Sequence, residues 1–200
     1  MSKKKSLQSW EPDALQAVRT LRSGGVLLHA SDTVWGLAAD AQHPEAVSRI
    51  FQIKKRPIEQ TLITLVSSES QLETLIPNLP EAAWELLEVS DRPVTIVGRL
   101  GANSRYQLAP GLVASDGTVA VRLVKDPYNL FILKGLDRPM ASTSANTSGA
   151  PTPIRFQEVE QAIVEGVDFA GEHHRNEPTS SQPSMLVKFD EAGRIQLIRS

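Results

Sequence analysis

Two clusters of polar side chains in this 200-residue chain are of types that bind anions and support chemistry on phosphate groups. Lys54-Lys55-Arg56 combines compact ammonium groups with a planar guanidinium, which meets phosphate oxygens two at a time. The stretch 142–149, STSANTSG, offers short hydroxyl and amide side chains that bind oxygens and tolerate tight turns. Neither usual glycine-rich phosphate motif, G-x-x-x-x-G-K-[ST] or G-x-G-x-x-G after a strand, is present. Phosphate binding would therefore depend on these two clusters.

Each cluster also has a purely structural interpretation. Basic residues at a helix end favour the helix dipole without binding a ligand, and the stretch 142–149 fits a plain polar loop. A third piece, TVAVR at 118–122, places Thr118, Ala120 and Arg122 on one face of a predicted strand. An arginine on a sheet face pairs with a carboxylate of the protein or, less commonly, with one of a substrate. Residue types alone leave these alternatives open.

The segment 30–56 is predicted to place the cationic cluster and a polar turn beside one cleft. Short apolar runs at 26–29 and 34–38 predict two buried strands on either side of the turn 31–33. A helix is expected from Pro44, and Pro57 forbids its continuation, so Lys54, Lys55 and Arg56 fall at its end. If both polar ends face the same cleft, the cleft takes an anionic substrate.

Strands and helices alternate along the rest of the chain, without a repeated sequence. Their irregular spacing predicts an α/β domain with a twisted mixed sheet flanked by helices, rather than a regular doubly wound sheet. The polar stretch 171–183 is expected to be a loop. Further strands are predicted at 62–66, 94–97, 119–124, 140–142, 185–189 and 194–198, and helices at 12–21, 68–76, 80–89, 127–135 and 155–165.

Composition limits the classes of protein to which this chain can belong. With 40% hydrophobic and 22% charged residues, we expect one globular domain over residues 1–200, with residues 1–8 disordered. The net charge of −2 argues against binding nucleic acid by bulk electrostatics, although a local basic groove remains open. The absence of cysteine excludes disulfides, thiolate zinc sites and a cysteine nucleophile. We predict a cytoplasmic protein, because no apolar run has the length of a signal peptide core or a membrane span.

Other polar residues favour structural roles. The adjacent His173 and His174 would point apart and lack a third ligand, so a solvated loop is favoured over a metal site. His29 has no obvious partner, which favours a core or cap role over catalysis. Asp32 could act as a base, but an aspartate in a turn usually bonds its own backbone.

Taken together, the motifs SDTVWGL, KKRP, TVAVR and STSANTSG, in this order, resemble the L-threonylcarbamoyladenylate synthase family of YrdC-like proteins. The K-x-R and S-x-N pairs are the signature of that family, and the similarity covers roughly residues 12–198. The resemblance implies a YrdC-like fold with a concave, positively lined cleft. It also implies a nucleotidyltransferase that makes threonylcarbamoyl-AMP and pyrophosphate from L-threonine, bicarbonate and ATP, as the first step of tRNA threonylcarbamoyladenosine modification.

The resemblance also implies roles for individual residues. Lys54 and Arg56 would be the catalytic, phosphate-binding pair, and Thr33, Arg122 and Ser142 would hold threonine. Mg²⁺ would arrive with ATP and be held largely by the nucleotide, with no metal site on the protein. The implied partners are a downstream tRNA threonylcarbamoyl-transfer complex and, weakly, RNA, including double-stranded RNA. The ATP site would comprise Lys54, Arg56, Gln60, Thr118, Ser144, Asn146 and Ser184.

Several positions depart from the family pattern. Trp35 replaces a tyrosine and would keep an aromatic wall, SDRP at 90–93 replaces WPGP, and Leu65 stands where some relatives carry a threonine-contacting histidine. Gln60 also departs from the usual residue. A paralogue group lacks the K-x-R pair, so the alternative function is a non-catalytic RNA- or nucleotide-binding paralogue. The presence of Lys54 and Arg56 argues against that group.

Overall fold

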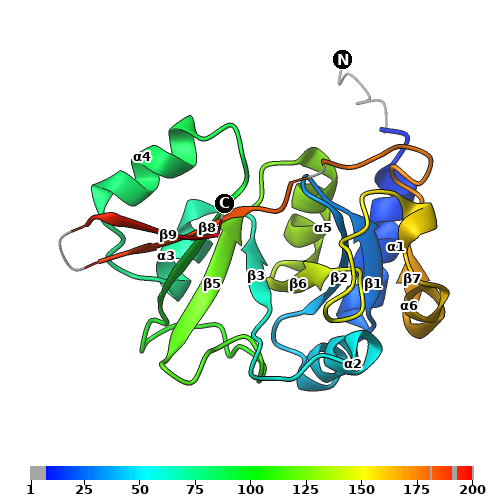
Figure 1. Ribbon diagram of the computed structural model, residues 1–200, viewed down its shortest axis with the longest axis horizontal. Coiled ribbons are helices and arrows are strands. Elements are labelled where there is room, and N and C mark those ends of the chain that lie inside the picture. The colour runs from blue at the N-terminus through cyan, green and yellow to red at the C-terminus, as the bar shows by residue number, and fades with distance from the viewer. Residues whose placement is uncertain (1–7, 181, 191–192, 200) are drawn as a thin grey trace, which may run out of the picture.

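Strands β1 to β9 of the computed structural model form one mixed sheet with the order β7-β1-β2-β6-β3-β5-β4-β8-β9. The structure describes residues 8–180, 182–190 and 193–199. In Figure 1 the sheet crosses the whole molecule, from β7 at one side to the β8–β9 hairpin at the other. The strands are β1 (Leu27–Ala30), β2 (Trp35–Asp40), β3 (Ile63–Val66), β4 (Val94–Arg99), β5 (Thr118–Leu123), β6 (Met140–Ser144), β7 (Phe169–Ala170), β8 (Met185–Phe189) and β9 (Ile195–Arg199).

Several described helices begin beside residues that satisfy a free backbone N–H group or lack one. In α2, Pro44 occupies the first turn, and His43 Nδ1 accepts a hydrogen bond of 3.3 Å from the Ala46 N–H. Asp126 caps α5 by accepting from the Asn129 N–H at 2.9 Å. The helices are α1 (Glu11–Arg22), α2 (Pro44–Lys54), α3 (Glu69–Leu75), α4 (Glu81–Val89), α5 (Pro127–Leu136) and α6 (Gln161–Gly166), with a 3₁₀ turn η1 (Phe156–Glu158).

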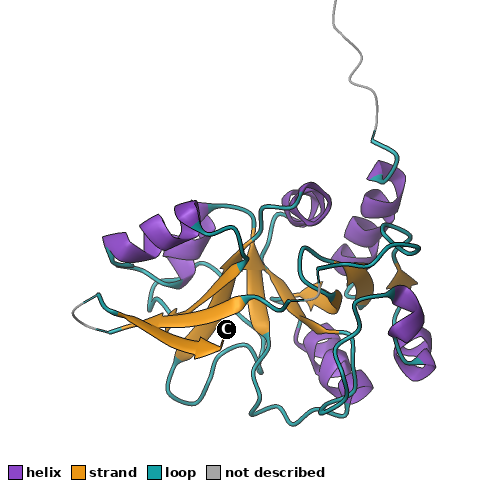
Figure 2. Ribbon diagram, turned by 45° about the horizontal axis from the view of Figure 1, so that its top comes forward, coloured by secondary structure: helices purple, strands orange, loops and turns teal. Residues whose placement is uncertain are grey.

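Alternation along the strands separates the two faces of the sheet. On one face, Leu28, Trp35 and Leu37 are buried in a cluster that includes residues of α2 and α6. On the other face, Leu27 and Ala38 pack with α1 and α5. Helices α3 and α4 bury a third cluster against β3, β4, β5 and β8. Figure 2 shows the helices arranged around the twisted strands, which leaves part of the sheet uncovered.

The sheet is mixed, as the sequence predicts. Pairs β3–β5, β4–β8 and β1–β7 run parallel, while β1–β2, β2–β6, β3–β6, β4–β5 and β8–β9 run antiparallel. The predicted loop at 171–183 contains no helix or strand among its described residues. In the part of the chain that the structure describes, no helix has the length and apolar composition needed to cross a membrane.

Three details differ from the sequence prediction or fall outside the described residues. The helix expected at 155–165 is interrupted, because Val159 adopts an extended backbone between η1 and α6 and packs into the core. The two-residue strand β7 was not predicted, since two residues are too few to show alternation. Disorder was predicted for residues 1–8, of which residues 1–7 lie outside the described part of the chain.

Candidate functional site

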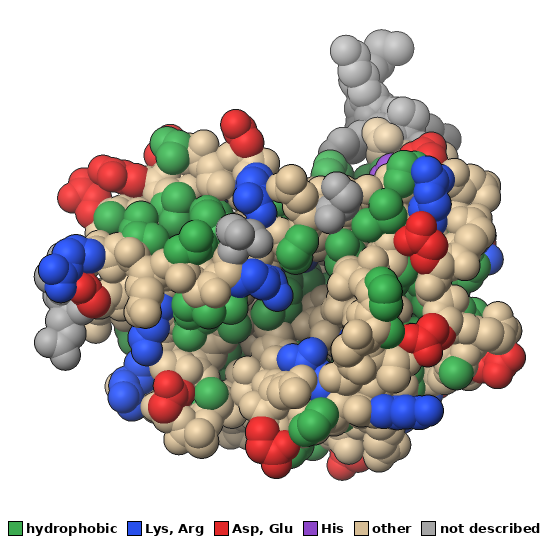
Figure 3. Space-filling model, viewed as in Figure 1, with side chains coloured by type: hydrophobic (Ala, Val, Ile, Leu, Met, Phe, Trp, Pro, Cys, Tyr) green, Lys and Arg blue, Asp and Glu red, His purple; other side chains and the backbone are tan. Residues whose placement is uncertain are grey.

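A cavity of about 520 Å³ lies on the same face of the sheet as α1 and α5. A row of residues across four neighbouring strands forms its floor: Ser142 pairs with Ile63, Ile63 with Ala120, and Ala120 with Val97. Figure 3 shows this face hollowed near its centre, with Lys and Arg side chains beside the recess. The volume falls within the range of roughly 300–1,000 Å³ that is typical of small-molecule sites.

The polar turn between β1 and β2 forms one wall of the cavity. The Ser31 hydroxyl accepts hydrogen bonds from the N–H groups of Thr33 and Val34, at 3.1 and 3.2 Å, and so closes the turn. Ser31 Oγ also lies 2.8 Å from Thr33 Oγ1. The turn therefore places two hydroxyl groups side by side at the cavity wall, where both residues line it.

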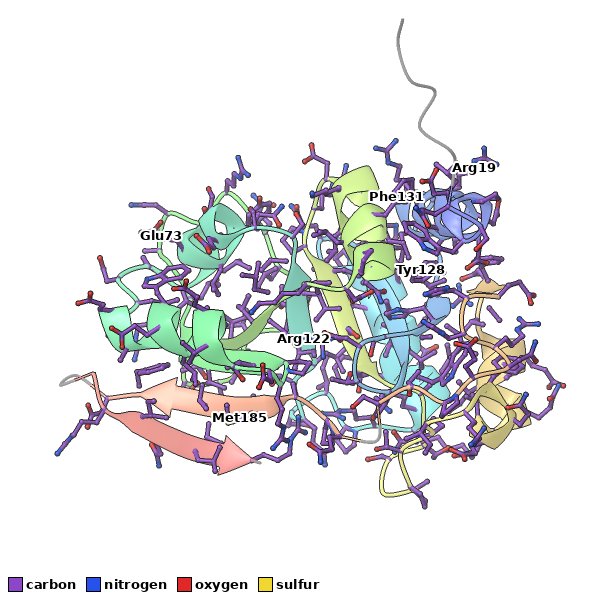
Figure 4. All side chains as sticks on the ribbon, turned by 90° about the horizontal axis from the view of Figure 1, so that it is seen from above. Arg19, Glu73, Arg122, Tyr128, Phe131 and Met185 are labelled. Carbon is purple, nitrogen blue, oxygen red and sulfur yellow. The ribbon has the colours of Figure 1, made fainter. Side chains whose placement is uncertain are left out.

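Arg122 links this wall to the floor. Its Nη1 donates to Thr33 Oγ1 at 3.2 Å, and its Nη2 lies 3.2 Å from Asp32 Oδ1. The residue is only 3% exposed, yet it lines the cavity together with Thr118 and Ala120, as strand alternation predicts. Figure 4 labels Arg122 near the middle of the molecule. The sequence left two interpretations of Arg122 open, pairing with a protein carboxylate or with a substrate carboxylate. The structure is compatible with both, because Arg122 pairs with Asp32 and still faces the cavity.

Lys54 lies behind the cavity wall rather than in it. Its ammonium donates hydrogen bonds to the backbone carbonyls of Ser144 and Asn146, the latter at 2.5 Å. Burial, followed by the positive charge of Arg56, lowers the pKa of Lys54 to about 8. The Lys54 carbonyl in turn accepts from the Ser148 N–H at 3.0 Å. Lys54 therefore fixes the backbone of the loop after β6, a role that the helix-dipole interpretation does not explain.

Arg56 lines the cavity at the end of α2. Lys55, with φ at 50°, ends the helix in the left-handed conformation, and the chain then turns so that Arg56 faces the adjoining loop. Its Nε and Nη2 donate to the carbonyls of Gln60 and Thr61, at 2.7 and 3.0 Å. Burial lowers the pKa of Arg56, which nevertheless stays a cation at neutral pH. The guanidinium is thus held in place at the edge of the cavity.

The loop after β6 is held by side chains as well as by Lys54. Asn146 donates through Nδ2 to the carbonyls of Thr147 and Ala150, at 3.0 and 2.7 Å. Glu160 accepts from both the N–H and the hydroxyl of Thr147, at 3.0 and 2.6 Å. These bonds stabilise the ionised Glu160 and lower its pKa. The loop is therefore an ordered structure rather than a plain polar connection.

The far side of the cavity comes from the last two strands and the start of β5. Ser184 is buried, and its hydroxyl lies 2.7 Å from Thr95 Oγ1. Arg199, on β9, donates to the Ser184 carbonyl at 3.2 Å and lines the cavity. Thr118 donates its hydroxyl to Asp116 at 2.7 Å, and these contacts lower the pKa of Asp116.

Charge in the cavity is of one sign. Arg56, Arg122 and Arg199 line it, and among the described lining residues there is no aspartate or glutamate. A cavity with three guanidinium groups and several hydroxyls fits a ligand that carries phosphate and carboxylate groups. The described residues contain no group of three or more metal-binding side chains.

His29 is buried on β1, close to the cavity floor. It pairs across β1–β2 with Gly36, which lines the cavity, and a Cβ on Gly36 would lie 3.5 Å from His29 Nε2. Neither ring nitrogen makes a hydrogen bond of normal geometry among the described residues, although Asn129 and the Ala30 backbone lie close enough to oppose the fall in its pKa. Burial lowers the pKa of His29 to about 4, so the ring is neutral at pH 7. This agrees with the predicted core role.

The structure brings most of the predicted site residues together. Lys54, Gln60 and Asn146 do not line the cavity: the first and last support the loop, and the Gln60 carbonyl holds Arg56. Their assignment to ATP stays a prediction. Sequence reasoning assigned no site role to Ser31, although it begins the SDTVWGL motif, and missed Thr152 and Arg199, which lie in none of the four motifs. The predicted residues that line the cavity are Thr33, Arg56, Thr118, Arg122, Ser142, Ser144 and Ser184.

Two departures from the family pattern lie in the core. Trp35 is fully buried and packs against the Phe156 ring, with centroids 5.2 Å apart, on the face opposite the cavity floor. The expectation that it provides an aromatic wall of the site is therefore wrong, because alternation along β2 turns it away. Leu65 is buried in the α1–α5 cluster. The SDRP stretch at 90–93 lines a separate cavity of about 310 Å³.

The Sua5/YciO/YrdC family model, described as "Telomere recombination", matches residues 19–200. The chain belongs to this family. A protein named threonylcarbamoyl-AMP synthase from Saccharophagus degradans is 33% identical over 150 residues, which are 72% of this chain and 74% of the relative. A second protein with that name, from Stenotrophomonas maltophilia, is 32% identical over 154 residues, or 76% of this chain and 81% of the relative.

Solved structures agree with this membership. The structure of Pyrococcus abyssi Sua5 in complex with L-threonine superposes with a TM-score of 0.78 at 28% identity, over 98% of this chain. The present chain spans 55% of the length of that protein.

Proposed function

We propose that this protein is an L-threonylcarbamoyladenylate synthase, which makes threonylcarbamoyl-AMP and pyrophosphate from L-threonine, bicarbonate and ATP. The observation that carries the proposal is one cavity with a carboxylate-binding end and a phosphate-binding end. Arg122 donates to the Thr33 hydroxyl and shares the cavity with Ser142, and Arg56, Arg199 and Thr118 also line it. The names of the relatives and the threonine complex of Sua5 support the same activity.

Strand spacing supports the placement of two substrates in one cavity. Thr118 and Arg122 lie on the same face of β5, four residues apart, which corresponds to about 13 Å at the usual rise per residue. This separation leaves room for an amino acid near Arg122 and a nucleotide near Thr118. We infer that Arg122 binds the threonine carboxylate, with Thr33 and Ser142 as hydroxyl partners, and so directs the amine toward the nucleotide.

The chemistry then needs orientation and charge stabilisation rather than a protein nucleophile. The neutral amine of threonine attacks the carbon of bicarbonate, and water leaves to give a carbamate. With CO₂ in place of bicarbonate, the same carbamate forms and the amine proton passes to water. A carbamate oxygen bonds to the α-phosphorus of ATP, and the bond from that phosphorus to the bridging oxygen breaks as pyrophosphate leaves. Arg56 faces the cavity and would stabilise the negative charge that builds on the phosphates. Holding both reactants in one cavity supplies the orientation.

Lys54 contributes indirectly in this proposal. By holding the carbonyls of Ser144 and Asn146, it fixes the loop whose Ser144 lines the cavity. The catalytic role expected for Lys54 is therefore proposed as support for the phosphate-binding loop. Mg²⁺ that arrives with ATP would supply further charge neutralisation, held by triphosphate oxygens and water because no carboxylate lines the cavity in the described part of the chain.

The product is a mixed anhydride of a carbamic acid and a phosphate, which is an activated acyl donor. We therefore expect a transfer reaction onto a tRNA adenosine to consume it, and a downstream tRNA threonylcarbamoyl-transfer complex to be the partner. Weak RNA binding and a cytoplasmic location stay predictions. No feature of the cavity favours the alternative of a non-catalytic RNA- or nucleotide-binding paralogue, since the K-x-R pair is present and ordered.

Pyrophosphate release tests the proposed reaction. Purified protein is supplied with MgATP, threonine and bicarbonate, and each substrate is omitted in turn. The proposal predicts pyrophosphate release that requires threonine, is reduced when bicarbonate and CO₂ are removed, and is lost in Arg56→Ala. Release of pyrophosphate that is independent of threonine, or no release from folded protein, would contradict it.

A further inference from the structure

Asp32 lies in the polar turn but does not close it. That task belongs to Ser31, whose hydroxyl accepts from the N–H groups of Thr33 and Val34. The Asp32 carboxylate instead lies 3.2 Å from Arg122 Nη2. The sequence predicts that Asp32 bonds its own backbone. In the structure, its charged contact is instead with the Arg122 side chain.

The Asp32–Arg122 pair is shielded from solvent. The Arg122 side chain is 4% exposed and the Asp32 side chain 20% exposed, so bulk water and salt screen the pair far less than a surface ion pair. Among the described residues, no other carboxylate forms an ion pair with Arg122. Removing the Asp32 charge would thus leave a buried guanidinium with Thr33 as its remaining side-chain partner.

Asp32 reaches Arg122 from behind the proposed substrate site. Arg122 lines the 520 Å³ cavity, whereas Asp32 lines two smaller cavities of about 310 and 250 Å³. The carboxylate therefore does not face the place where a substrate would bind. This position is unsuited to a general base but suited to fixing an arginine from its rear side.

The guanidinium retains donors for a ligand after these contacts. Nη1 donates to Thr33 and Nη2 lies beside Asp32, so each of these nitrogens keeps a second N–H, while Nε is buried without a hydrogen-bond partner among the described residues. We propose that Asp32 is a positioning residue that fixes Arg122, so that its remaining N–H groups bind the carboxylate of the amino-acid substrate. This inference rests on the proposed function, since it assumes that Arg122 binds the threonine carboxylate.

A neighbouring aspartate provides a matched control. Asp126 lines the same two smaller cavities as Asp32 but makes no ion pair with Arg122 among the described contacts. It caps α5 by accepting from the Asn129 N–H. Because asparagine is also a good N-cap, Asp126→Asn removes a nearby negative charge while the helix cap is kept.

Calorimetric titration with two ligands separates positioning from general damage. L-Threonine carries the carboxylate, and L-threoninol replaces it with a hydroxymethyl group. We expect Asp32→Asn to weaken threonine binding about tenfold or more, with threoninol binding changed less than about twofold. Asp126→Asn should bind both ligands as the unsubstituted protein does. Asp32→Glu, which keeps the charge, should recover part of the threonine affinity. Thermal melting shows which variants are folded.

The outcomes distinguish this inference from the proposed function. If the unsubstituted protein binds threonine and Asp32→Asn keeps its preference for threonine over threoninol, the positioning role is overturned and the proposed function stands. An equal loss for both ligands also overturns it, because that loss indicates a change in cavity shape. If the unsubstituted protein does not bind threonine in the presence of ATP, both fail. Should Asp32→Asn not fold, Asp32→Ser, which also removes the charge, decides: an unchanged preference for threonine over threoninol would overturn the role, and a loss confined to threonine would support it.

Discussion

Arg122 Nη1 donates a hydrogen bond of 3.2 Å to Thr33 Oγ1, across 89 positions of sequence. The bond joins β5 to the turn between β1 and β2, and both residues line the same cavity. The two halves of the chain therefore complete one site.

Thr33→Val removes the hydroxyl while almost preserving the volume of the side chain. Arg122 then loses one of its two side-chain partners, so we expect the KM for threonine to rise about threefold to tenfold with little change in kcat. Thr64→Val is the control, because Thr64 is also buried, lies off the cavity and has no partner for its hydroxyl among the described residues. Equal threonine KM values in the two variants would contradict the role of Thr33.

Lys54→Met removes the ammonium that bridges the Ser144 and Asn146 carbonyls, while it keeps most of the side-chain length. We expect ATP binding to weaken about tenfold or more, and amide hydrogen exchange in residues 144–150 to accelerate, because the loop loses its anchor. Lys55→Gln, at the adjacent exposed lysine, serves as the control. Weaker ATP binding without faster exchange would show that Lys54 acts on the nucleotide directly rather than through the loop.

Arg199→Gln tests the contribution of the last strand. Arg199 is one of three guanidinium groups that line the cavity, so its loss should weaken ATP binding about fivefold to tenfold. Arg194→Gln, whose side chain is 81% exposed at the far end of the hairpin, should leave ATP affinity unchanged. Fluorescence titration with an ATP analogue measures both values. Identical affinities for the two variants would remove Arg199 from the site.

His29 predicts a specific pH dependence of stability. Burial lowers its pKa from 6.5 to about 4, so between these values the unfolded chain binds more protons than the folded protein. The free energy of unfolding should therefore fall as pH decreases through this window, by about 3 kcal/mol in full. Urea unfolding at pH 7 and pH 4.5 measures the fall in the free energy of unfolding between these pH values. In His29→Phe, this fall should lose the contribution of His29. His174→Gln, at an exposed histidine, should keep it, and a His29→Phe profile parallel to that of the unsubstituted protein would contradict the assignment.

Local pattern predicted the elements of this fold better than their arrangement. Apolar runs and helix-stopping prolines predicted the elements around Thr33 and Arg56, and alternation correctly placed Thr118 and Arg122 on one face. The strand order could not be predicted, because it depends on pairings between distant segments such as β3 with β6. Arg199 was missed for the same reason: only the position of β9 beside β8 brings it to the cavity.

The directions of side chains were the second feature that could not be predicted from the sequence. Motif spacing identified Lys54 but could not show that its ammonium turns to backbone carbonyls, since that depends on the path of the loop after β6. Trp35 was expected at the site, and the pairing register of β2 places it in the core instead. Asp32 showed no sequence signal for an ion pair with Arg122, a residue in the other half of the chain.

The chemical identity of the nucleotide product tests the central claim most directly. The protein is incubated with MgATP, threonine and ¹⁴C-labelled bicarbonate, and the products are separated and analysed by mass spectrometry. The account predicts one labelled nucleotide with the mass of threonylcarbamoyl-AMP, absent without threonine and absent in Arg56→Ala. AMP or ADP without any labelled nucleotide, from protein that binds both ATP and threonine, would contradict it.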